Sequence, residues 1–114
     1  MKVLSVMTHD PTAASGPPTQ EEMENMGALI AEMRGSGVLI DTGGRMPNML
    51  ELTVVRKNGK TTITDGPFTE AKEVVGGYAL LEVKDRDDAI ALTNRFLDVI
   101  GGGTCHLHEV ESPP

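Results

Sequence analysis

The sequence predicts one domain of the α+β class, in which an antiparallel sheet carries two helices on one face. Three observations support this prediction. Short segments rich in strand-forming residues alternate with two longer segments whose apolar residues recur at helical spacing. Capping residues and glycines mark the ends of the two longer segments. The 114 residues suffice for a single domain over 1–114 with a modest hydrophobic core.

The first part of the chain predicts a strand, a loop and a helix. Residues 2–7, KVLSVM, favour a strand, and the three prolines between residues 8 and 19 favour a loop. The run TQEE at 19–22 is a capping-box pattern that predicts the start of a helix over 20–34. The predicted inner face of this helix consists of apolar residues at helical spacing: Met23, Met26, Leu29, Ile30 and Met33.

Strands and a tight turn are predicted between the two helices. GVLIDTGG at 37–44 reads as a short strand that breaks into glycines. Residues 50–56 and 60–64 are predicted to form a hairpin around Asn58-Gly59, because both turn residues tolerate a positive φ. A further strand is predicted over 76–83. Its alternation places on one face Tyr78, Leu80 and Glu82.

The last part of the chain predicts a second helix and a final strand. Asp85 is the expected cap of the helix, the glycines at 101–103 end it, and residues 104–110 form the strand. The predicted inner face of this helix consists of Ala89, Thr93, Phe96, Leu97 and Ile100. Since each helix has one apolar stripe, both can cover the same sheet face, which is a ferredoxin-like arrangement.

Composition excludes several classes of protein. The net charge is −7 and no basic stripe is present, so neither nucleic acid nor an anionic membrane surface is an expected partner. Cys105 is the only cysteine, which fits a reducing compartment. The chain has no long apolar run, and its start turns polar too early for a signal peptide. We therefore expect a soluble cytoplasmic protein.

The composition also favours a homodimer. Aromatic residues make up only 3% of the chain, and part of the missing volume comes from seven methionines, which specify shape poorly. A layer of helices on one sheet face would leave apolar residues of the other face in contact with water. A second subunit would cover that face, so the expected first partner is another copy of the chain.

The segment TDGPFTEAKEVVGGYALLEV at 64–83 resembles the signature of YCII-related proteins of the DGPF subfamily. The MKVLSVM start, the EEM of the first helix, the GVLI that follows it and the closing GGG and HEV resemble that subfamily too. The resemblance implies a dimeric α/β barrel made of two ferredoxin-like sheets. The matching signature positions are Asp65, Gly66, Pro67, Phe68, Glu70, Lys72, Glu73, Gly76, Gly77 and Tyr78.

The same resemblance implies two different kinds of function. Some YCII relatives look like small enzymes that use a histidine–aspartate pair, with the histidine on the first helix. Here Asp65 stands at the aspartate position, but the first helix contains no histidine. Relatives of the DGPF type are similar to proteins found beside, or joined to, sigma factors of the extracytoplasmic-function class, which implies a sigma-factor partner.

Asp65 is the first candidate for acid–base chemistry. A carboxylate against apolar walls can have its pKa raised into a useful range. The alternative is structural, with the carboxylate accepting the amide of Phe68 as a cap. His9, at the end of the first predicted strand, could serve as the catalytic partner of Asp65 if the two strand ends lie close together.

Three further residues are candidates for ligand binding. Phe68 would form a pocket wall or else an interface plug. Lys72 would bind an anionic group, or else belong to an exposed charged face. Tyr78 would offer its hydroxyl to a ligand or to water.

The last strand carries a weak metal-binding pattern. His106 and His108 are two residues apart and so face the same side, but a metal site needs further ligands and Cys105 points the other way. We therefore expect no metal and no cofactor. The sequence leaves two function classes open: a protein that binds, and weakly transforms, a small organic molecule, and a dimeric interaction module without catalytic activity.

Overall fold

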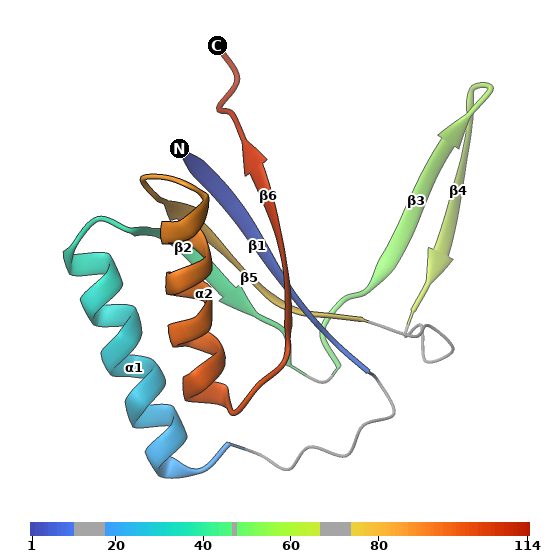
Figure 1. Cartoon of the computed structure of the whole chain (residues 1–114). Helices are drawn as coiled ribbons and strands as arrows, with labels where there is room; N and C mark the ends of the chain where they lie inside the picture. Colours follow the sequence, from blue (N-terminus) through green and yellow to red (C-terminus); the bar gives the residue numbers. More distant parts are fainter. Residues whose placement is uncertain (11–17, 47, 67–73) are drawn as a thin grey trace.

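A computed structural model describes residues 1–10, 18–46, 48–66 and 74–114 and has the predicted α+β class (Figure 1). The elements in chain order are β1 Lys2–His9, α1 Gln20–Gly35, β2 Leu39–Gly44, β3 Leu52–Lys57, β4 Lys60–Asp65, β5 Val74–Glu82, α2 Arg86–Ile100 and β6 Thr104–Val110. Each element coincides with a predicted segment, within about two residues at each end. Neither helix in this part of the chain has the length and apolar character that a membrane-crossing helix needs.

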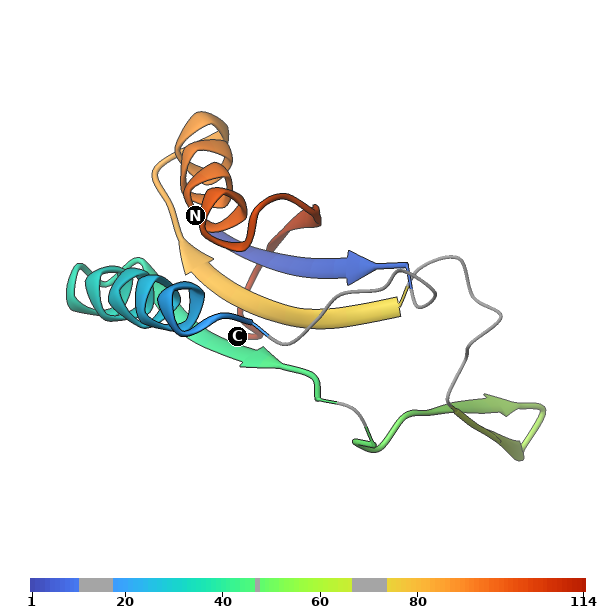
Figure 2. The same ribbon diagram turned by 90° about the horizontal axis from the view of Figure 1, so that it is seen from below.

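The main sheet has four strands in the order β2-β5-β1-β6, and all neighbouring strands are antiparallel. This order agrees with a ferredoxin-like plan if the hairpin between β2 and β5 is an insertion. The sheet of the single chain is open, not closed into a barrel. The two helices lie on one side of it, as Figure 2 shows.

The hairpin of β3 and β4 corrects the prediction of one antiparallel sheet. It forms a two-stranded sheet of its own and stands apart from the main sheet (Figure 1). The predicted turn is confirmed, since Asn58 and Gly59 both have positive φ, 52° and 76°. Local sequence thus determined the hairpin, but not which sheet it joins.

Both helix starts follow the predicted capping chemistry. The hydroxyl of Thr19 accepts the amide of Glu22 at 3.1 Å, and the carboxylate of Asp85 accepts the amide of Asp88 at 2.9 Å. Each bond satisfies an amide that has no partner within its helix. The second helix ends where Gly101 adopts the left-handed conformation, with a φ of 83°.

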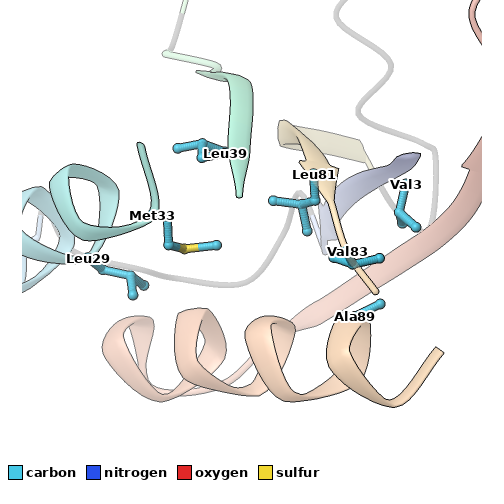
Figure 3. Packing of buried hydrophobic residues seen from close by; sticks show 7 residues of the cluster. All are labelled: Val3, Leu29, Met33, Leu39, Leu81, Val83 and Ala89. Atoms are coloured by element: carbon cyan, nitrogen blue, oxygen red, sulfur yellow. The ribbon is translucent and has the colours of Figure 1, made fainter. Parts of the chain in front are cut away.

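The core lies between the helices and the main sheet (Figure 3). Its buried apolar residues are Val3, Leu29, Met33, Leu39, Leu81, Val83 and Ala89. Met23 is a correction to the predicted inner face of α1: it is exposed, because the first turn of the helix extends beyond the packed core. On α2, Leu92 and Val99 pack against the core although they were not predicted to.

The pairing register decides which sheet residues face the helices. Directly opposed residues of antiparallel strands share a face, and the face alternates along each strand. Val3 is opposite Leu81 and faces the helices, whereas Leu4 is opposite Leu80 and faces away. The predicted alternation of β5 is confirmed. The side away from the helices, called the open face below, includes Leu4, Val6, Tyr78, Leu80, His106 and His108.

Candidate functional site

A cavity of about 490 Å³ lies between the main sheet and the two helices. Its lining comes from residues 26–33 of α1, from residues 92–100 of α2, and from all four strands of the main sheet. Its walls are mainly apolar side chains, among them Met7, Met26, Ile30, Phe96 and Ile100. Volumes of this size are typical of pockets that hold small organic ligands. No charged side chain of the described segments lines the cavity.

The polar groups of the cavity are few. Ser5 is buried and Cys105 is half-buried, and the Ser5 side chain hydrogen-bonds the thiol. The hydroxyls of Thr42 and Thr93 are used within the fold, since they donate to the carbonyl oxygens of Tyr78 and Ala89 at 2.8 Å. Ser5 and Cys105 are therefore the groups best placed to orient a ligand.

Ser5 was not predicted to be a site residue, and no role was predicted for Cys105. A signal was present in the alternation of the strands. Ser5 and Met7 lie two and four residues after the buried Val3, so all three side chains share the helix-facing side. The apolar stripes of the helices did not predict a cavity, because apolar residues that fill a core and apolar residues that line a pocket have the same spacing.

The thiol of Cys105 is predicted to be a slow nucleophile. Burial raises its pKa, and the hydrogen bond with Ser5 offsets part of that rise. Because the thiolate is the reactive form, alkylation by iodoacetamide near neutral pH should be slower than for an unfolded thiol. The rate should increase as the pH rises toward the raised pKa. Mass spectrometry of the single-cysteine chain measures this directly, and a rate equal to that of the denatured protein would contradict it.

His9 lies beside the edge of this cavity. A Cβ atom on Gly76 would come within 2.9 Å of His9 Nδ1 and 3.0 Å of Met7 Cε. Both Gly76 and Met7 line the cavity, so the imidazole stands next to its edge. This close approach gives a physical reason for glycine at position 76.

Asp65 and His9, the predicted acid–base pair, end strands of two different sheets. Asp65 ends β4, is exposed, and is opposite Leu52 in the hairpin sheet. His9 ends β1, which pairs only with β5 and β6 in the main sheet. Phe68 and Lys72 lie outside the described residues, as does the predicted cap on the Phe68 amide. The roles of these four residues stay predictions.

Tyr78 borders the cavity but directs its hydroxyl elsewhere. The ring lies over Gly43, where an added Cβ would meet Tyr78 Cε1 at 2.7 Å. The hydroxyl donates to Asp41 Oδ2 at 2.7 Å, and this hydrogen bond raises the pKa of Tyr78. The phenol is therefore part of the open face, where it links β5 to β2.

His106 and His108 share one face of β6, as predicted from their spacing, and the register makes it the open face. They are opposite Val6 and Leu4 of β1, and His106 Nε2 is 3.2 Å from the hydroxyl of Thr8. Among the residues that the structure describes, no group of three or more histidine, cysteine, aspartate or glutamate side chains is arranged to hold a metal ion.

Comparison with known proteins identifies a family. The YCII-related domain matches residues 1–98, which include α1, all but the last two residues of α2, and every strand except β6. No curated protein matches the chain.

Proposed function

We propose that this chain, which belongs to the YCII-related family, binds a small, uncharged and mainly apolar organic molecule between the helices and the main sheet. The observation that supports this proposal most directly is the cavity of about 490 Å³, lined by apolar side chains of α1, α2 and the sheet. Burying an apolar ligand against such walls would supply most of the affinity. An ionised ligand would find no counter-charge among the described lining residues.

The polar groups of the cavity suggest how a ligand would be oriented. Ser5 and Cys105 lie together on the sheet side, so one polar atom of the ligand would hydrogen-bond there. His9 stands beside the edge at Gly76, where it would contact the part of the ligand that reaches solvent. The proposal concerns binding. Acid–base catalysis by Asp65 with His9 stays a prediction, and so does an interaction module with a sigma-factor partner.

We further propose that the protein is of the DGPF type and works as a homodimer whose open faces meet. Three aliphatic residues on the open face, Leu4, Val6 and Leu80, are only partly covered within the chain. Tyr78, on the same face, is 41% exposed. Two copies that brought these faces together would remove that apolar surface from water and form the dimeric barrel that the family resemblance implies.

The cavity proposal predicts the binding of an uncharged fluorescent probe. N-phenyl-1-naphthylamine should bind the protein with enhanced fluorescence, because its aromatic rings would transfer from water into an apolar site. Replacing Ala79 with leucine should weaken this binding about tenfold or more, since the added side chain would occupy space that the probe needs. Fluorescence titration measures both affinities.

Ala91→Leu is the matched control, because the same change is then made at an exposed position of α2. This variant should bind the probe like the unmodified protein. The bound probe should also slow the alkylation of Cys105, which lines the cavity. Equal probe affinity in the Ala79→Leu and Ala91→Leu variants, or no binding to the unmodified protein, would refute the proposed site.

A further inference from the structure

We propose that the β3–β4 hairpin is an arm that packs against a second copy of this chain. The proposal rests on the homodimer proposed above and adds a second contact to it. The contact surface is the side of the hairpin that carries Leu52, Val54 and Ile63, called the apolar arm face below.

The hairpin has apolar side chains but no core of its own. Every residue of β3 and β4 is exposed. Val54 is directly opposite Ile63, so the two side chains share a face, and the alternation of β3 places Leu52 on that face too. These three side chains are 39–59% exposed. Aliphatic residues that gather on one side of an exposed hairpin indicate a surface that another chain covers.

An isolated two-stranded hairpin is at best marginally stable in water, so this one needs support. The main support within the described chain is at its base. Arg45 donates from its backbone amide to the carbonyl oxygen of Gly76 at 2.9 Å and from Nη1 to that of Leu50 at 3.0 Å. Its guanidinium also lies 3.6 Å from the Glu51 carboxylate, and the amide of Gly66 donates to the Glu51 carbonyl oxygen at 2.7 Å. The base is tied to β5, while the strands beyond it lack cover.

The dimensions of the chain agree with an arm that stands apart from the core. The radius of gyration is 16.1 Å, whereas a compact domain of this length would have about 13 Å.

Charge favours a second copy over most other partners. The end of the hairpin carries Arg56, Lys57 and Lys60, which are three of the ten basic residues in a chain with 17 acidic ones. A basic arm end is complementary to the acidic remainder of the same chain. Lys57 and Lys60 are directly opposite each other at the turn. Their like charges disfavour the bare hairpin and would be relieved by an acidic surface.

The position of the arm fits the proposed dimer. Figures 1 and 2 both show the main sheet between the two helices on the left and the hairpin on the right. The arm is therefore on the side of the open face, and a second copy that covered this face would lie beside it. A contact between the apolar arm face and that copy would support the hairpin and enlarge the interface.

Two neighbouring substitutions test the arm. Val54→Asp places a charge on the apolar arm face, and Val55→Asp places the same charge on the other face of the same strand. Sedimentation velocity at a series of concentrations should show that Val54→Asp raises the dissociation constant of the dimer about tenfold or more. Val55→Asp should change it much less. Equal effects of the two variants would overturn the proposal.

Hydrogen exchange provides a second test of the arm. It uses the unmodified protein, so its result does not depend on whether a variant folds. The amides of residues 52–65 should become better protected as the protein concentration rises through the dissociation constant. If the protection of these amides did not depend on protein concentration, the proposed contact between the hairpin and a second copy would be refuted.

The variant Leu80→Asp separates the arm from the dimer on which it rests. If Leu80→Asp dissociates the dimer while Val54→Asp leaves it intact, the proposed arm contact is refuted and the proposed dimer through the open faces is supported. If the unmodified protein is a monomer at every concentration, both are refuted. Probe binding in the cavity is measured independently of either result.

Discussion

Replacing Leu81 with alanine is expected to lower the free energy of unfolding by about 2–5 kcal/mol. Leu81 is 4% exposed and lies on β5, between Val3 of β1 and Leu39 of β2. It also lines the cavity. Truncation would therefore remove apolar contacts and enlarge a space that the surrounding strands cannot easily fill, so a value in the upper half of this range is expected.

Urea denaturation followed by circular dichroism measures this change. Domains of this kind are typically stable by only about 5–15 kcal/mol, so the loss should be visible as a large shift of the midpoint. Ile90→Ala is the control, because Ile90 is an aliphatic residue of α2 that is 37% exposed. If both variants lost the same stability, Leu81 would not be a central residue of the core.

Local sequence predicted the elements well because their ends depend on neighbouring residues. The capping bond from Glu22 to Thr19 and the positive φ of Asn58 and Gly59 involve contacts within three positions of the chain. The place of the hairpin depends instead on which strand edges pair, and β-sheet pairing is not determined by the local pattern. This explains why β3 and β4 were predicted as strands but not as a separate sheet.

The candidate site could be predicted only in part. Sequence patterns emphasise charged and unusual residues, and they drew attention to Asp65 and His9. The structure places these residues in different sheets, with only His9 near the cavity. The cavity itself depends on how α1, α2 and the main sheet diverge from one another, and its apolar lining has the spacing of an ordinary core. A cavity of this kind depends on how whole helices and strands pack together, and a short sequence motif does not predict that packing.

Gly77 is the position where a single methyl group should disturb both the sheet and the site. A Cβ atom there would lie 2.8 Å from the carbonyl oxygen of Gly43 and 3.4 Å from Cα of Gly44. Since both neighbours are backbone atoms of β2, they cannot yield by changing a rotamer. Gly77→Ala should therefore push β2 away from β5 and destabilise the protein by about 1–3 kcal/mol.

Gly27→Ala provides the opposite expectation for the same chemical change. Gly27 is in α1, and an added Cβ would meet nothing within 4 Å. Alanine should stabilise the helix there by about 0.5–1 kcal/mol. Urea denaturation of both variants tests the comparison, and a Gly77→Ala variant as stable as the unmodified protein would show that β2 has room to move.

The Gly77 variant also reports on how the cavity and the hairpin are connected. β2 carries Asp41, which holds the Tyr78 hydroxyl, and leads to Arg45, which ties the base of the hairpin to Gly76. A displaced β2 should therefore weaken probe binding in the cavity and loosen the hairpin in the same variant. Faster hydrogen exchange at residues 52–65 together with weaker probe binding is the expected result. If probe binding fell while exchange at the hairpin stayed unchanged, the hairpin would be held by contacts other than those that run through β2.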